Sequence, residues 1–378
     1  MKIKENQIRI EEWLFLLCFG IWFFFCCMYF SEWRRILPIG DLREYTSYLA
    51  IVLIIPNILI NRKQISVKNY VLMGAFLVVS YLSELYSGTD FIFITSVWIV
   101  LARNLDKKRI VKESLLIMLV CFVLVIISTR LGFISNVVVS EERGRWSLGY
   151  TFPSFGSHMV LFISLAFLMV CEVIDWIKLT LCLVANIVIF CLTDTKVDLI
   201  VAVAVFLIGM VIVYDRNKFL IGKCGKLFTV FPLMALLVSY LGQYFYNPHS
   251  KVWLAVDDLI TGRLRLGHEM MMSTPHTWMG QEIEWVSGYS TVGYNFVDNF
   301  FLHCGLNQGI LYLAIFVIGL CYAFRYAVKK EDKGLLIVLM GITLHGLIDP
   351  QLGNLYWQPF ILYIGCMFTD EKLEASNV

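Results

Sequence analysis

Apolar residues in this chain come in about a dozen blocks, most of them near the length of a membrane-crossing helix. A hydrocarbon core roughly 30 Å thick needs about 20 apolar residues in helical conformation. The pattern therefore predicts an all-α, polytopic integral membrane protein with about 12 transmembrane helices. We expect these helices at residues 13–30, 45–61, 68–87, 90–102, 111–129, 154–174, 177–192, 196–214, 219–243, 298–323, 333–350 and 352–369.

Membrane helices use most of the chain, so we expect residues 1–378 to form a single transmembrane domain. The first apolar block ends in bulky residues, which favours a retained helix over a cleaved signal peptide. Two polar segments, residues 130–153 and 243–297, are longer than a simple turn. Long loops in compact proteins are often functional. We expect residues 243–297 to be an extracytoplasmic loop that contains short helices.

Lysine and arginine are distributed unequally between the two sides of these helices. With the N-terminus in the cytoplasm, 21 of the 31 lysines and arginines fall in cytoplasmic segments and 10 in outer ones. The positive-inside rule then predicts that both termini are cytoplasmic. All six histidines fall in outer loops or at the outer ends of helices. We therefore expect the chemistry of this protein on the extracytoplasmic face.

Composition and motifs exclude several classes of function. The net charge is +2, which gives no reason to expect nucleic acid as a partner. No HExxH motif, zinc-type His/Cys spacing or DxD in an outer loop is present, so no metal site is predicted. No GxxxxGK[ST] loop is present, so nucleotide hydrolysis is not indicated, and no cofactor is predicted.

Two arginines, Arg143 and Arg145, precede the predicted helix at 154–174. Thr151 can cap this helix, and Pro153 suits its first turn. The positive end of the helix dipole then lies at the outer surface, where the arginines would complete an anion site. Two arginines that meet lipid headgroups would produce the same pattern, and this alternative stays open.

The short hairpin at residues 193–198 carries a lysine between two acids. Charged groups at membrane depth are costly unless they are paired or face water. Lys196 therefore either pairs with Asp194 or Asp198, or adds a further cation to an outer cavity.

The long loop contains a second basic cluster. Residues 257–269 predict a short helix capped near Thr261, with Arg263 in its first turn and Arg265 following. Arg263 could hold a phosphate already drawn to the helix start, and a solvated lid helix over the bundle is the alternative. His276 and Trp278 follow in a segment rich in aromatic residues. Aromatic rings suit the apolar faces of sugars, but they are also common at membrane interfaces.

Asp298, Asn299 and His303 open the next predicted membrane helix at its outer end. An acid at a helix start is favoured by capping and by the dipole. The same acid could take a proton from a sugar hydroxyl, with His303 nearby. His345 and Asp349, near the outer end of another helix, form a weaker candidate pair.

Taken in order, these motifs resemble those of the polysaccharide repeat-unit polymerases of capsule, O-antigen and exopolysaccharide pathways. The motifs are Arg-x-Ser-Leu-Gly-Tyr at 145–150, Thr-Asp-Thr-Lys at 193–196, Thr-Gly-Arg-Leu at 261–264 and Val-Asp-Asn-x-x-Leu at 297–302. The resemblance covers about residues 143–311. The related O-antigen ligases look similar here but carry a histidine before the asparagine. Asp298 in that position favours a polymerase.

The resemblance implies a lipid-linked glycosyltransferase of the GT-C-like type in the bacterial cytoplasmic (inner) membrane. It implies that the enzyme joins polyprenyl-pyrophosphate-linked oligosaccharides on the extracytoplasmic face. The bilayer surrounds it, and chain-length regulator and flippase proteins are its expected partners. Two alternatives stay open, namely a ligase-type transferase that uses another acceptor and a flippase or other transporter.

Carried over by position, the resemblance assigns roles to individual residues. Arg145 and Arg263 match arginines expected to grip the pyrophosphate, so we expect both to converge on one diphosphate. Asp298, or else His276, would orient or deprotonate the acceptor hydroxyl. Lys196 stands where an arginine is expected and cannot provide a bidentate grip. The remaining predicted contacts to the substrate are Arg143, Arg265, Lys196, Trp278, Asn299 and His303.

Overall fold

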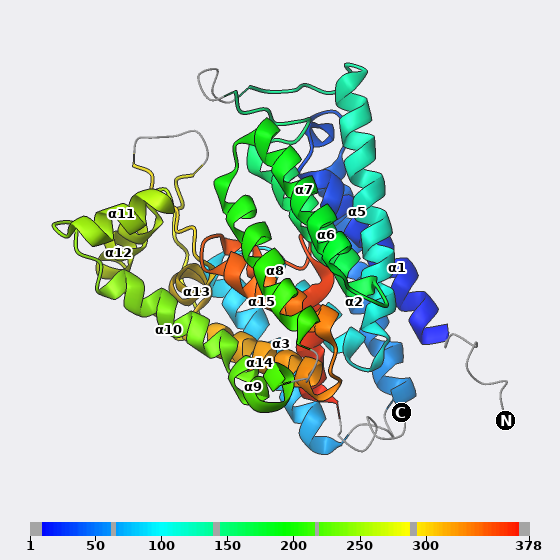
Figure 1. Ribbon diagram of the computed structural model, residues 1–378. Helices are drawn as coiled ribbons and strands as arrows, with labels where there is room; N and C mark the ends of the chain where they lie inside the picture. The colour runs from blue at the N-terminus through cyan, green and yellow to red at the C-terminus, as the bar shows by residue number, and fades with distance from the viewer. Residues whose placement is uncertain (1–9, 62–65, 139–143, 216–218, 288–292, 370–378) are drawn as a thin grey trace.

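The computed structural model describes residues 10–61, 66–138, 144–215, 219–287 and 293–369 (Figure 1). In this part of the chain the regular structure is helical, apart from two isolated β-bridges. The predicted all-α class is confirmed. The helices are α1 Ile10–Tyr29, α2 Ile39–Asn61, α3 Val67–Ser87, α4 Ile92–Leu101, α5 Lys107–Arg130, α6 Pro153–Val170, α7 Trp176–Thr193, α8 Lys196–Tyr214, α9 Phe219–Thr229, α10 Phe231–Tyr244, α11 Lys251–Leu259, α12 Arg263–Ser273, α13 Phe300–His303, α14 Ile310–Lys329 and α15 Lys333–Gly346. Shorter helical turns are η1 Glu32–Arg35, η2 Ala102–Asn104, η3 Cys304–Gln308, η4 Pro350–Gly353 and η5 Pro359–Phe368.

Seven of the described helices are long and apolar enough to cross a membrane, or eight if the bent pair α9–α10 is one span. This composition supports a polytopic membrane protein. The other four predicted helices correspond to α2 and to the shorter apolar helices α4, α15 and η5. Twelve complete spans therefore stay a prediction.

Three predicted helices are interrupted, each at a residue that disfavours continuous helix. The helix expected at 219–243 bends by 49° before α10, whose first turn contains Pro232. The helix expected at 298–323 is divided into α13 and α14 by the π-turn η3 and Gly309, whose φ is 95°. The helix expected at 352–369 is reduced to the 3₁₀ turn η5, because Gln358 precedes a proline and is extended.

Helices α5, α6, α7 and α8 pack against one another in chain order, and α15 packs against α6, α8 and α14. Nearly every residue of α15 is buried, and Figure 1 shows this helix in the middle of the bundle. The start of α6, the start of α8 and the end of α15 consequently meet at one end of the molecule. The sequence assigns this end to the exterior.

The long loop leaves the bundle after α10. Helices α11 and α12 stand to one side of the other helices (Figure 1). Residues 274–287, which follow α12, have no regular secondary structure, and three backbone hydrogen bonds join this segment to η3 and the start of α14. Ile310 N donates to Thr277 O at 3.0 Å, Leu311 N donates to Trp278 O at 3.1 Å, and Gln281 N donates to Asn307 O at 2.8 Å. The long loop is thereby attached to the helical bundle through its backbone.

Gly309→Ala is expected to destabilise the protein by about 2–5 kcal/mol, because the change adds backbone strain and overlap at this attachment. Gly309 has a φ of 95°, and an added Cβ would lie 2.3 Å from Gly280 N and 2.7 Å from Trp278 O. Thermal unfolding in detergent measures the loss. The matched control is Gly132→Ala, where φ is 78° but the surrounding space is open. Equal losses of stability in the two variants would show that overlap of the added Cβ with the backbone of Gly280 and Trp278 does not destabilise Gly309→Ala.

Candidate active site

A pocket of about 320 Å³ lies at the N-terminal end of α6. The residues that enclose it come from η1, from the first two turns of α6, from the segment before α13 and from η4. Its polar lining includes Arg34, His158, Tyr294, Asp298 and Asp349. Charged and titratable groups from segments far apart in the sequence thus meet in one cavity. This pocket is the candidate active site.

The start of α6 forms one wall of the pocket. Pro153 occupies the first helical position, as predicted, but Thr151 does not cap the helix. Instead, the Thr151 backbone N and hydroxyl both donate to Phe30 O, at 2.9 and 3.2 Å. Phe152 is the N-cap residue, and no described side chain accepts a hydrogen bond there. The first N–H groups of α6 therefore offer positive charge next to the pocket.

Asp298 lies on another wall, with 21% of its side chain exposed. Arg263 Nη2 is 3.6 Å from Asp298 Oδ2, and Tyr294 also forms a hydrogen bond with this carboxyl group. Burial raises the pKa of Asp298 to about 6, and the attraction of Arg263 only partly opposes this rise. A carboxyl group with such a pKa exchanges its proton close to neutral pH, which suits a general base.

The sequence predicted that Arg263 could hold a phosphate at the start of α12, and the structure differs at this point. The N-terminus of α12 is occupied by the Asp257 carboxylate, which accepts hydrogen bonds from Leu264 N at 2.8 Å and Arg265 N at 3.1 Å. The expected phosphate site at this helix start is therefore wrong, because an internal anion already fills it. Thr261 is also not the cap: its hydroxyl accepts a hydrogen bond from Arg263, and Gly262 is the N-cap residue.

The two arginines expected to grip a diphosphate both adjoin the pocket through residues that line it. Arg263 contacts Asp298. The Arg145 guanidinium lies 5.9 Å from the centre of the Phe152 ring, and its Nε donates to Thr193 O at 3.2 Å. Convergence of both arginines on one ligand stays a prediction. Arg143 lies outside the described residues.

The other predicted cations lie elsewhere. Arg265 is on the exposed face of α12 and pairs with Glu269 at 3.1 Å. Lys196 is the exposed first residue of α8. The proposed pairing of Lys196 with Asp198 is wrong, because Asp198 is buried and its side chain contacts two histidines instead.

Three further predicted residues, His276, Trp278 and His303, lie outside the pocket lining. The His276 ring is 5.6 Å from the Tyr240 ring, and burial lowers the pKa of His276. Trp278 is 67% exposed. His303 stacks on Trp285 with ring centres 4.5 Å apart, and burial lowers the pKa of His303 to about 4. A role for any of these three at the pocket stays a prediction.

Asn299 has a structural role next to Asp298. Its Oδ1 accepts from Leu302 N at 3.1 Å, which caps α13, and from the Ser239 hydroxyl at 2.8 Å. Its Nδ2 donates to Leu347 O at 2.7 Å. With these three bonds, Asn299 fixes the backbone that carries Asp298. Of the described residues predicted to act in catalysis or substrate binding, Asp298 is the one that lines the pocket.

Sequence reasoning missed three residues at this site. Arg34 was not singled out, although it belongs to a Trp-Arg-Arg run after the first outer helix end. Asp349 was named only as half of a weak pair with His345. His158 was noticed only for its outer position, and its partners lie on other helices. Two of these three, His158 and Asp349, are buried.

An apolar groove of about 450 Å³ runs along the outside of α5, α6 and α7. Its lining is almost wholly hydrophobic and includes Phe122, Val160 and Ile189. At one end it reaches Arg130 and Leu192, the C-terminal ends of α5 and α7. Leu192 O accepts a hydrogen bond from Trp146 N at 3.1 Å, so this groove ends beside the segment that carries Arg145.

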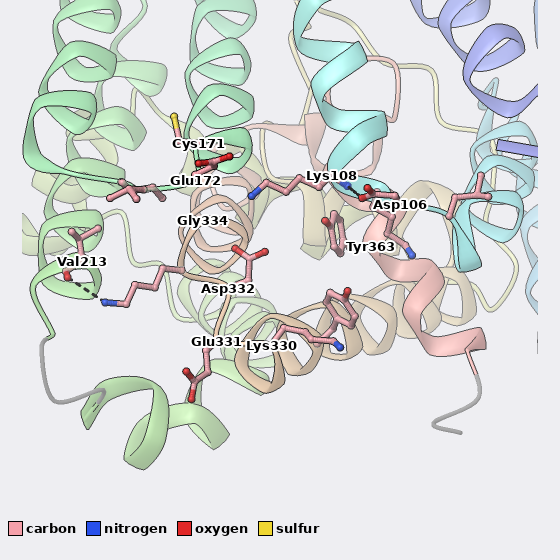
Figure 2. A pocket seen from close by; sticks show the side chains of 16 residues that line it. Asp106, Lys108, Cys171, Glu172, Val213, Lys330, Glu331, Asp332, Gly334 and Tyr363 are labelled. Atoms are coloured by element: carbon pink, nitrogen blue, oxygen red, sulfur yellow. Dashed lines mark hydrogen bonds between the residues drawn. The ribbon is translucent and has the colours of Figure 1, made fainter. Parts of the chain in front are cut away.

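A larger cavity, of about 730 Å³, lies at the other end of α6, and Figure 2 shows the side chains that line it. It is formed by the starts of α5 and α15 and the end of α6. Its charged lining is mixed and consists of Asp106, Lys107, Lys108, Glu172, Lys330, Glu331, Asp332 and Lys333. The lysines here belong to the excess that predicts the cytoplasmic side.

Comparisons with known proteins do not assign this chain to a family. No protein-family model matches the sequence, and a search of curated proteins finds no match. The function is therefore argued from the site itself.

Proposed function

We propose that this protein is a polysaccharide polymerase of the GT-C-like type, which joins polyprenyl-pyrophosphate-linked oligosaccharide repeat units on the outer face of the bacterial cytoplasmic membrane. One observation carries the proposal. The pocket at the start of α6 combines a titratable carboxyl group, Asp298, with an uncapped helix N-terminus and adjoining arginines. Glycosyl transfer from a diphosphate needs both a proton acceptor and positive charge.

The positive charge would stabilise the leaving group. As the bond between the sugar anomeric carbon and the phosphate oxygen breaks, negative charge builds on the pyrophosphate. The N–H groups at the start of α6, with Arg34 and Arg145 near them, provide fixed positive charge where water is partly excluded. Such preorganised charge is often the largest single contribution to catalysis.

The lipid part of the donor would occupy the groove along α5, α6 and α7. Its wall is apolar, and Arg130 stands at its outer end. A polyprenyl chain in the groove would place its pyrophosphate near the segment that bears Arg145. This arrangement lets the tail stay in the bilayer while the headgroup enters the pocket.

The acceptor sugar would lie against Asp298. Asp298 takes the proton from the acceptor hydroxyl, whose oxygen forms the new bond to the anomeric carbon while polyprenyl pyrophosphate leaves. Arg263 and Tyr294 hold the carboxyl group in place. Phe152, Phe155 and Phe296 line the same pocket and offer apolar faces for sugar rings.

A transporter is the second candidate, and a specific observation favours it. Cavities lie at both ends of the bundle, and ionisable residues are buried in α6, α8 and α15. Buried ionisable groups in membrane helices often mark transport pathways. Supplying lipid-linked glycan on one leaflet alone separates the two functions, because a polymerase lengthens it there and a flippase does not.

Arg34→Ala and Arg145→Ala are each expected to lower the elongation rate by about 10- to 100-fold, because each removes one charge-assisted contact of about 1.5–3 kcal/mol to the leaving group. The purified protein is incubated with a defined polyprenyl-pyrophosphate repeat unit, and product length is followed as a ladder on a gel. Lys251→Ala, an exposed residue at the start of α11, is the control and should leave the ladder unchanged. A wild-type ladder from both arginine variants would contradict the assignment, and no ladder from the wild type would contradict the function.

A further inference from the structure

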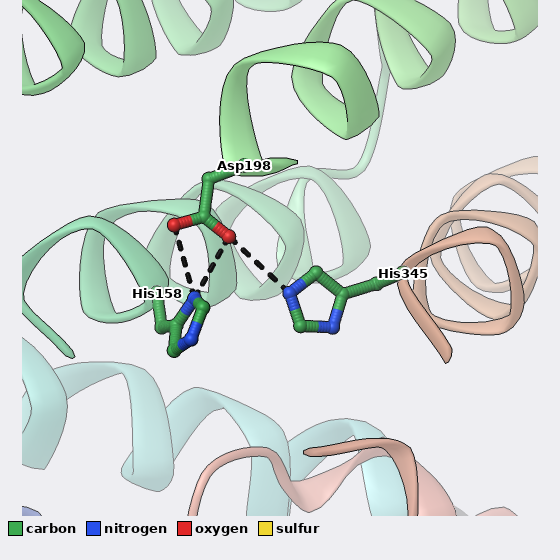
Figure 3. A group of neighbouring side chains, drawn as sticks. All are labelled: His158, Asp198 and His345. Atoms are coloured by element: carbon green, nitrogen blue, oxygen red, sulfur yellow. Dashed lines mark hydrogen bonds and ion pairs between the residues drawn. The ribbon is translucent and has the colours of Figure 1, made fainter. Parts of the chain in front are cut away.

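Three buried side chains with metal-binding atoms meet inside the bundle (Figure 3), and one of them, His158, also lines the pocket. His158 comes from α6, Asp198 from the first turn of α8 and His345 from the last turn of α15. Their exposed fractions are 2%, 1% and 1%. Both histidines point toward the Asp198 carboxylate, although they lie 40 and 147 residues from it in the chain.

The donor atoms have spacings close to those of a metal site. His158 Nδ1 is 2.8 Å from Asp198 Oδ1, and His345 Nε2 is 3.2 Å from the same oxygen. One donor atom from each residue lies within 4.8 Å of the other two. Neighbouring ligands in a tetrahedral zinc site, with bonds of about 2.0–2.1 Å, are roughly 3.3 Å apart. The shortest donor pair, His158 Nδ1 and Asp198 Oδ1, would separate by about half an ångström to accommodate the ion.

A second carboxylate supports one of the histidines from behind. His158 Nε2 lies 3.4 Å from Asp349 Oδ2. A metal-binding histidine usually directs its other ring nitrogen to a carboxylate or carbonyl, which fixes its orientation and tautomer. His158 therefore has the two contacts that a metal ligand requires, one on each ring nitrogen.

The charges of the cluster also fit a divalent cation. Asp198 and Asp349 are both buried, and the partners of Asp198 within the described part of the chain are the two histidines. Buried carboxylates are costly unless compensated. One divalent cation with two neutral histidines would balance the two carboxylates.

We propose that His158, Asp198 and His345 bind one divalent transition metal ion, with Asp349 orienting His158. Two imidazoles and one carboxylate are a donor set typical of zinc, and three protein ligands leave a fourth position for water. The ion would join α6, α8 and α15 directly beneath the pocket. This proposal does not depend on the glycosyltransferase function, because it concerns ion binding alone.

Metal analysis of tag-free, full-length protein tests the proposal. Purified in detergent and supplied with zinc, the wild type should retain about one zinc per chain after desalting. Asp198→Asn and His345→Ala should each retain less than about a tenth of that amount, and Asp349→Asn should bind zinc about 10- to 100-fold more weakly. His268→Ala, outside the cluster, is the matched control and should retain zinc fully.

Measurements on the wild type decide the matter even if a ligand variant fails to fold. Cobalt added to chelator-treated protein should produce the visible absorption of a four-coordinate site, and X-ray absorption at the zinc edge should show imidazole ligands. Absence of bound zinc and of the cobalt spectrum would overturn the proposal in favour of a metal-free hydrogen-bonded network. Zinc retained equally by a folded Asp198→Asn variant would also overturn it.

Discussion

An Asp298→Asn variant is expected to elongate lipid-linked glycans roughly 10²- to 10⁴-fold more slowly than the wild type, because the amide cannot accept the proton of the acceptor hydroxyl. The change keeps the size of the side chain and leaves Asn299 to hold the backbone. The rate of ladder formation at saturating substrate measures the loss. An Asp298→Asn variant with the wild-type rate would show that another group accepts the proton.

The pH dependence of the same reaction provides an internal control. The wild-type rate should rise as pH increases through about 6, where Asp298 loses its proton. Arg263→Ala should move this midpoint to higher pH, because Arg263 favours the charged carboxylate. If the midpoint stays unchanged in Arg263→Ala, the group whose titration controls the rate is not Asp298.

The raised pKa of Asp298 also has a consequence for stability. The folded-state pKa of about 6 exceeds the ordinary value, so the folded state holds this proton more tightly than the unfolded state. The contribution of this group to the free energy of unfolding is present at low pH and is lost as pH rises from about 4 through the folded-state value. Asp298→Asn should remove this dependence from thermal unfolding curves.

Asp198→Ala is expected to destabilise the protein by about 3–5 kcal/mol, because it leaves two buried histidines without the carboxylate they contact. His158 Nδ1 and His345 Nε2 lie 2.8 and 3.2 Å from Asp198, and all three side chains are almost fully buried. Thermal or denaturant unfolding in detergent measures the loss, and no substrate is needed.

The control for this variant is Glu269→Ala, which removes a carboxylate from an exposed pair with Arg265. Exposed pairs of this kind contribute only about 0.3–0.5 kcal/mol. A small loss in Glu269→Ala and a large one in Asp198→Ala would show that burial of a carboxylate and its partners decides how much their contacts contribute to stability. Similar losses in both would mean that the bundle does not depend on the Asp198 cluster.

The boundaries of several helices follow from the composition of the segment itself, so the sequence predicts them well. The segments expected at 154–174, 177–192 and 196–214 correspond to α6 at Pro153–Val170, α7 at Trp176–Thr193 and α8 at Lys196–Tyr214. Their apolar length and the polar residues between them determine these boundaries. The prediction failed where one continuous apolar block conceals a break, as at Pro232 and Gly309.

The sequence predicted only some of the residues that form the candidate site. Asp298 stood out because it opens a predicted helix at the outer surface, and it does line the pocket. Thr151 and Thr261 looked like helix caps, but Thr151 instead bonds to Phe30 and Asp257 takes the place expected for a phosphate. Side-chain hydrogen bonds of this kind depend on which segments lie adjacent in space, and spacing along the chain does not reveal that.

The sequence by itself determined the all-helical class and the position of most helices, because these follow from apolar length and local composition. Tertiary structure alone decided the environment of Asp198. From the sequence it was a hairpin acid beside Lys196, and packing of α6, α8 and α15 places it between His158 and His345. Contacts between residues 40 and 147 positions apart have no local signature, since they arise only when separate helices bury their faces against one another.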